Sequence, residues 1–161
     1  MRVSTSWGMP VFTAACAATL VAGAGMTITE IGPWYHSLKQ PGWAPPDWAF
    51  GVIWTTVFFL IACSGATSWM RAPGGRAAEI LLGLFALNGF LNLLWSFLFF
   101  RLHRPDWALI EVVALWLSIL VLIVISWRSS RSAAFLLIPY LVWVSIAAVL
   151  NYQVVMLNAP F

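Results

Sequence analysis

Charged residues are scarce in this chain. Only 8% of the 161 residues are Asp, Glu, Lys or Arg, and 62% are hydrophobic, whereas an ordinary soluble domain carries about 25% charged residues. This composition predicts a single integral membrane domain covering residues 1–161. The net charge of +3 is small, and its carriers lie between apolar stretches. They indicate cations that flank membrane helices and exclude a nucleic-acid-binding surface.

Motifs for metal binding and catalysis are also missing. Cys16 and Cys63 both fall in apolar stretches, and no disulfide framework or metal-ligand spacing is recognisable. No glycine-rich phosphate loop and no nucleophile–base pair occurs. His36 and His103 lie in predicted loops, where we expect solvated side chains in preference to haem ligands. The sequence therefore predicts no metal site and no obligatory cofactor.

Five long windows with little or no charge follow one another along the chain. Crossing a bilayer takes about 20 apolar residues, and a helix satisfies its backbone polar groups within the segment. The sequence therefore predicts an all-α integral membrane protein, a bundle of five transmembrane helices. The expected helices cover approximately residues 6–30, 47–70, 77–100, 105–127 and 132–157.

The N-terminal segment has an alternative interpretation. Ala22, Gly23 and Ala24 resemble the cleavage site of a signal peptide, but the apolar run continues past them to Ile28. We therefore favour a membrane helix. Cations number five on the N-terminal side of the bundle and three on the other, which predicts a cytoplasmic N-terminus.

A segment rich in tryptophan and proline joins the first two predicted helices. Pro41, Pro45 and Pro46 prevent a helix before about Asp47. The segment is too aromatic for a plain linker, so we expect residues 34–46 to form an ordered extramembrane loop, the first loop, folded over one end of the bundle. Asp47 is the expected N-cap of the next helix.

Amide and aromatic side chains at membrane depth suggest a binding pocket. Asn88, Asn92, Trp95 and Phe99 follow at helical spacing and should form one stripe facing the bundle interior. An aromatic lining with a few amide donors suits a flat, conjugated ligand. Ordinary bundle packing is the alternative explanation.

Glu111 is an acidic residue near the start of the fourth predicted helix. Ionisable residues inside a membrane are functional candidates by default. Because Glu111 lies about one turn inside the helix, we expect it to reach the interface or to pair with Arg101 or Arg104.

Four groups of residues resemble the TspO/translocator protein family, the tryptophan-rich sensory proteins also called peripheral-type benzodiazepine receptors. The likeness covers roughly residues 10–158 and implies a five-helix bundle, commonly a homodimer, surrounded by membrane lipid. The chain has no recognisable mitochondrial presequence, so a bacterial cell-envelope membrane is the expected location. The matching residues are, in order, Trp34, Tyr35, Leu38, Pro41, Trp43, Pro45, Pro46, Phe50 and Trp54; Asn92, Trp95, Ser96, Phe99 and Phe100; Ala108, Leu109, Glu111, Leu115 and Trp116; and Pro139, Tyr140, Leu141, Trp143, Ala147, Leu150 and Asn151.

The resemblance implies a pocket under the first loop that binds tetrapyrroles, such as protoporphyrin IX or haem, and synthetic ligands of the isoquinoline-carboxamide type. It implies a sensory or regulatory role in porphyrin homeostasis and stress. One alternative is an enzyme that degrades porphyrin in light through Trp54 and Trp143; another is a transporter of porphyrin or another apolar ligand, which liposome flux would reveal. The implied pocket residues are Trp34, Tyr35, Pro45, Pro46, Trp54, Asn88, Asn92, Trp95, Trp107, Trp143 and Ala147.

The chain also departs from the family pattern. No Lys or Arg follows Tyr152, so we expect no strong sterol binding through the family's cholesterol motif. Leu87 stands four residues after Gly83, so the small-residue pair that can drive helix association is absent there. The sequence therefore does not identify the dimer interface; Ala14, Ala18 and Ala22, spaced four residues apart on the first helix, are the alternative packing or dimer face.

Overall fold

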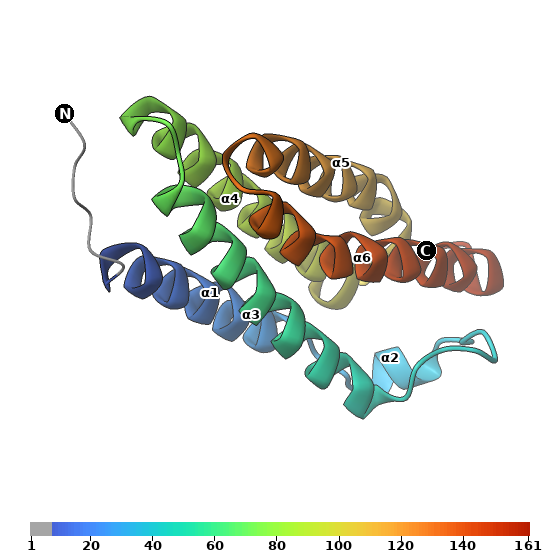
Figure 1. Cartoon of the computed structure of the whole chain (residues 1–161). Helices are drawn as coiled ribbons and strands as arrows, with labels where there is room; N and C mark the ends of the chain where they lie inside the picture. The colour runs from blue at the N-terminus through green and yellow to red at the C-terminus, as the bar shows by residue number, and fades with distance from the viewer. Residues whose placement is uncertain (1–7) are drawn as a thin grey trace.

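The computed structural model describes residues 8–161, which form helices and connecting loops with no strand among them. Five segments are long and apolar enough to cross a membrane, namely α1, α3, α4 with the turn that prolongs it, α5 and α6. The predicted five-helix membrane bundle is confirmed, although residues 6 and 7 of its first helix lie outside the described residues. The elements are α1 (Gly8–Ile28), α2 (Pro33–Ser37), α3 (Asp47–Met70), α4 (Gly75–Ser96), the π-helical turn η1 (Phe97–Arg101), α5 (Pro105–Ser129) and α6 (Arg131–Asn158) (Figure 1).

The core of the bundle lies where α5 and α6 pack against each other, the most extensive contact between elements. Ile119 of α5 and Tyr140 and Val144 of α6 are almost completely buried there, and Val57 of α3 joins them. Ser64 of α3 donates a hydrogen bond to the Ala133 carbonyl of α6 at 2.8 Å. Small residues let helices approach closely in a membrane, so α3 is held tightly against α6 at this end.

Helix α1 lies at the side of the bundle, along α3 (Figure 1). In this helix only Pro10 is buried. It also approaches α4, where a Cβ atom added at Gly89 would lie 3.3 Å from Cγ2 of Val21. The packing of α1 is therefore close at a few small residues and open elsewhere.

The first loop is ordered, but its start differs from the prediction. Residues 33–37 form a one-turn helix, α2, with Pro33 in its first turn. Proline is tolerated there because the first N–H groups of a helix have no intrahelical partner. Asp47 does not cap α3: Pro46 occupies the N-cap position, its carbonyl accepts from Ala49 N at 2.8 Å, and Asp47 lies in the first turn. Its carboxylate still faces the positive end of the helix dipole.

The first loop is attached to the C-terminal end of α6. The Asn158 side chain accepts a hydrogen bond from Lys39 N at 2.8 Å and donates one to Lys39 O at 3.0 Å. Trp43 Nε1 donates to Gln153 Oε1 at 2.8 Å. The chain therefore folds back over the bundle at this end, as predicted, and α6 fixes the position of the loop.

Replacing Asn158 with Ala is expected to loosen the loop at a trypsin cleavage site. Two hydrogen bonds to Lys39 are lost, and each contributes about 0.5–1.5 kcal/mol, so cleavage after Lys39, which needs local opening, should accelerate by about five-fold or more. The rate is measured by limited trypsinolysis and mass spectrometry of the detergent-purified protein. Met156→Ala, on the exposed face of the same helix, is the control and should leave the rate unchanged. Equal rates in both variants would show that Asn158 does not hold the loop.

Candidate functional site

A cavity of about 740 Å³ lies between α1, α3 and α4, and we call it the large cavity. Ligand sites commonly measure roughly 300–1,000 Å³. Ala15, Ala18, Ala22 and Gly25 form much of the α1 wall, so small side chains leave this space open. The opposite wall comes from α3 and α4 and includes Phe50, Trp54, Phe58, Phe59, Ala62, Cys63, Ala66, Asn92 and Ser96.

The lining of the large cavity is mainly apolar. Three of its four threonine hydroxyls bond to their own helices: Thr19 to the Ala15 carbonyl at 2.8 Å, Thr55 to the Gly51 carbonyl at 2.8 Å and Thr67 to the Cys63 carbonyl at 2.7 Å. Among the described residues, no side chain that lines this cavity carries a charge. The cavity therefore suits the apolar body of a ligand and offers no counterion for an ionised group.

A second space of about 60 Å³, the small cavity, lies directly under the first loop. It is large enough for water molecules and far below the size of a drug-sized ligand. Trp143 Nε1 and both side-chain polar atoms of Gln40 are buried here without a hydrogen-bond partner among the described residues. Trp54 and Phe50 line both cavities, so the two spaces adjoin.

The structure brings about half of the predicted pocket residues together. Tyr35, Trp95, Trp143 and Ala147 line the small cavity, Asn92 lines the large one, and Trp54 lines both. The rings of Trp54 and Trp143 are edge to face, with centroids 6.3 Å apart. These residues come from α2, α3, α4 and α6, so they converge only through the bundle packing.

The other predicted pocket residues line neither cavity. Trp34 stacks on His103 with ring centroids 4.1 Å apart. Trp107 is 48% exposed, with the Arg104 guanidinium 4.1 Å from its ring centroid. Asn88 is buried and donates to Ser118 Oγ of α5 at 2.8 Å. Pro45 and Pro46 lie in the first loop outside both spaces.

Sequence reasoning did not place α1 in the site. The available signal is the spacing of Ala14, Ala18 and Ala22, which indicates a packing or dimer face. Ala18 and Ala22 also line the large cavity. A stripe of small residues can either permit close packing or leave a space, and only the position of the neighbouring helix decides between them.

The amides of α4 face the bundle interior, as predicted. Asn92 Nδ2 donates to the Tyr140 hydroxyl of α6 at 3.2 Å, and both residues are buried. Together with the bond from Asn88 to Ser118, this links α4 to α5 and α6. Such bonds replace the water that the membrane lacks.

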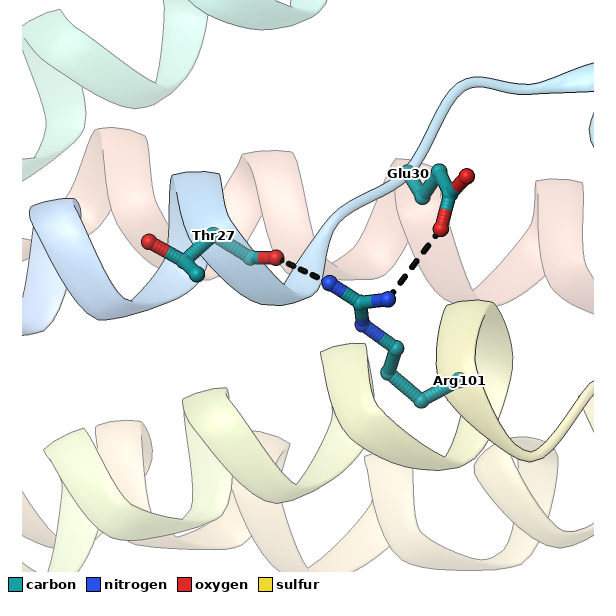
Figure 2. Close-up of polar contacts among 3 residues, drawn as sticks. All are labelled: Thr27, Glu30 and Arg101. Carbon is teal, nitrogen blue, oxygen red and sulfur yellow. Dashed lines mark hydrogen bonds and ion pairs between the residues drawn. The ribbon is translucent and has the colours of Figure 1, made fainter.

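Both expectations for Glu111, that it reaches the interface or that it pairs with Arg101 or Arg104, are wrong. Arg101 contacts Glu30 at 3.1 Å (Figure 2), and Arg104 pairs with Asp106. Glu111 is 9% exposed, and neither carboxyl oxygen has a hydrogen-bond partner among the described residues. The reason is its place on α5: it lies on the buried face with Ala108 and Leu115, turned away from the arginines of the loop.

Comparison with known proteins agrees with this architecture. Residues 12–157 match the TspO/MBR family. The chain belongs to the TspO/MBR family. It is 37% identical to protein CrtK of Rhodobacter capsulatus over 92% of this chain and 91% of that protein. It is 32% identical to the tryptophan-rich sensory protein of Cereibacter sphaeroides over 91% and 89%, respectively, and 36% identical to the translocator protein of Ovis aries over 74% and 72%. Family membership and the five apolar helices establish a multi-pass integral membrane protein.

Tyr140→Phe should destabilise the bundle, because it leaves the buried Asn92 amide without its acceptor. An unsatisfied buried donor costs about 1–3 kcal/mol, so the midpoint of thermal unfolding in detergent should fall. Tyr152→Phe is the matched control, since Tyr152 is 52% exposed. Adding Asn92→Leu to Tyr140→Phe should recover part of the loss, because neither polar group then remains unpaired. Equal midpoints for Tyr140→Phe and Tyr152→Phe would show that the bond contributes nothing.

Proposed function

We propose that this protein is a membrane sensory or regulatory protein that binds a tetrapyrrole, such as protoporphyrin IX or haem, in the large cavity. The observation that carries this proposal is an apolar space of about 740 Å³ with an aromatic wall. Trp54 and Phe58, which are stacked on each other at 27° with centroids 5.5 Å apart, both line this space, and aromatic side chains pack favourably against a conjugated ring. The name of the sensory relative from Cereibacter sphaeroides supports the sensory role.

The proposal differs from the sequence prediction in where the ring lies. The space under the first loop is too small for a tetrapyrrole, whereas the adjoining space beside α1 is large enough. Flat ligands of the isoquinoline-carboxamide type would use the same surface. The similarity to bacterial proteins over about nine-tenths of their length supports a bacterial cell-envelope membrane as the location. A homodimer stays a prediction.

Filling the large cavity should weaken ligand binding. Ala22 lines the cavity, whereas Ala17 is an exposed residue of the same helix outside it. Overpacking costs roughly 1–3 kcal/mol, so Ala22→Phe should weaken binding of protoporphyrin IX by about ten-fold or more, and Ala17→Phe should not. Binding is measured in the dark by saturable quenching of tryptophan fluorescence. Unchanged affinity in Ala22→Phe would move the site elsewhere, and no saturable quenching of wild type would remove the tetrapyrrole proposal.

Light-dependent degradation of porphyrin is the second candidate function. The contact of Trp54 with the large cavity favours it, because an indole close to an excited porphyrin can donate an electron to it. Trp143 lines only the small cavity, behind Trp54. If the protein is such an enzyme, Trp54→Phe should suppress light-dependent loss of the porphyrin absorption band more strongly than Trp143→Phe. Trp127→Phe, on the exposed surface of α5, is the control, and a stable band in illuminated wild type would favour the sensory role.

A further inference from the structure

The large cavity has no counterion for an acidic ligand. A carboxylate buried in apolar surroundings without a partner is strongly unfavourable. A tetrapyrrole such as protoporphyrin IX carries its carboxylates on one edge of the ring. That edge must therefore lie at an end of the cavity, and the loop end, where Met26, Thr29 and Ile31 line the cavity, is one such place.

Arg101, the last residue of η1, contacts the end of α1 whose neighbouring residue Met26 lines the cavity. Its Nη1 atom lies 3.1 Å from Glu30 Oε2, and its Nη2 atom donates to the Thr27 carbonyl at 2.6 Å (Figure 2). Met26 and Thr29, next to these two contact residues along the chain, line the large cavity. The Thr27 carbonyl belongs to the last turn of α1, the negative end of the helix dipole, so it orients the guanidinium while leaving the other nitrogen for a carboxylate.

The partner of Arg101 can be exchanged. The side chains of Glu30 and Arg101 are 63% and 44% exposed, and one contact joins them. Exposed pairs of this kind contribute little to stability. Glu30 lies in the connection between α1 and α2, where its side chain can turn to solvent without disturbing the helices.

The other two cations at the loop end, Arg104 and Lys39, are less able to bind a carboxylate at the cavity. Arg104 is held by Asp106 through two parallel bonds and packs over the ring of Trp107. Lys39 lies in the part of the first loop that is bound to Asn158 at the end of α6. Neither cation has a hydrogen bond to a residue at the end of α1, as Arg101 has to Thr27.

We propose that Arg101 binds the carboxylate of an apolar acid whose body fills the large cavity, and that Glu30 occupies Arg101 until the ligand displaces it. Arg101 is thus a specificity-determining residue, and Glu30 is an internal competitor that lowers the affinity for the free ligand. This inference rests on the proposed function, since it names the group by which the cavity selects its ligand.

The test compares protoporphyrin IX with its dimethyl ester, which has the same ring and no carboxylate. Dissociation constants are measured by tryptophan quenching in the dark, with the protein in nanodiscs of phosphatidylcholine. The variant Arg101→Gln removes a charged hydrogen bond to the carboxylate, so it should weaken binding of the acid by about ten-fold. The ester has no carboxylate, so its binding should be unchanged. Glu30→Gln should tighten binding of the acid by about two- to five-fold, the range of an exposed pair, and also leave the ester unchanged. Arg104→Gln is the control and should alter neither.

Each contrary result has a distinct meaning. If Arg101→Gln weakens acid and ester equally, Arg101 only positions α1, and the inference is overturned. It is also overturned if Glu30→Gln fails to tighten binding of the acid. This variant is informative because it retains Arg101 and its bond to the Thr27 carbonyl of α1. Equal binding of acid and ester by wild type removes the inference while the proposed function stands. Saturable binding of neither compound removes both.

Discussion

The hydrocarbon interior of a bilayer offers no hydrogen-bond partner, and the structure depends on this constraint. Backbone groups are satisfied within long helices, and buried side chains find partners on neighbouring helices. Asn92 bonds to Tyr140, Asn88 to Ser118, and Ser64 to a backbone carbonyl of α6. These contacts fix α3, α4, α5 and α6 against one another. Glu111 is a buried exception, because both of its oxygens lack partners among the described residues.

Helix α1 differs from these four helices in its contribution to the structure. It contributes little to the core and packs mainly along α3. Its small residues reduce contact where larger ones would fill the space, and the result is the large cavity. Dispersion contacts are lost around an unfilled apolar space, so an apolar ligand that restores them would stabilise the position of α1. A protein that reports ligand binding could use such a coupling.

Polarity is divided between the two parts of the site. The large cavity is apolar and uncharged, whereas the loop end holds Lys39 and two ion pairs, Arg101 with Glu30 and Arg104 with Asp106. The first loop is fixed there by its bonds to α6, and α1 is tied to η1 through Arg101. An amphipathic ligand would span both regions, with its ring in the cavity and its charged edge at the rim. Recognition of such a molecule needs both parts to hold their relative positions.

The amino-acid sequence determined the five helices, because apolar length and charge breaks are local properties of the chain. It also determined that Asn88 and Asn92 face inward, since helical spacing and the cost of exposing an amide to lipid leave no other stable arrangement. Only the tertiary structure decided which residues meet. Glu30 and Arg101 are 71 positions apart and pair because α1 and η1 end side by side, whereas Glu111 is turned inward, away from the arginines. The cavity was likewise decided by packing: the sequence shows that α1 has small residues, but the position of α1 relative to α3 and α4 determines whether they close a contact or leave a space.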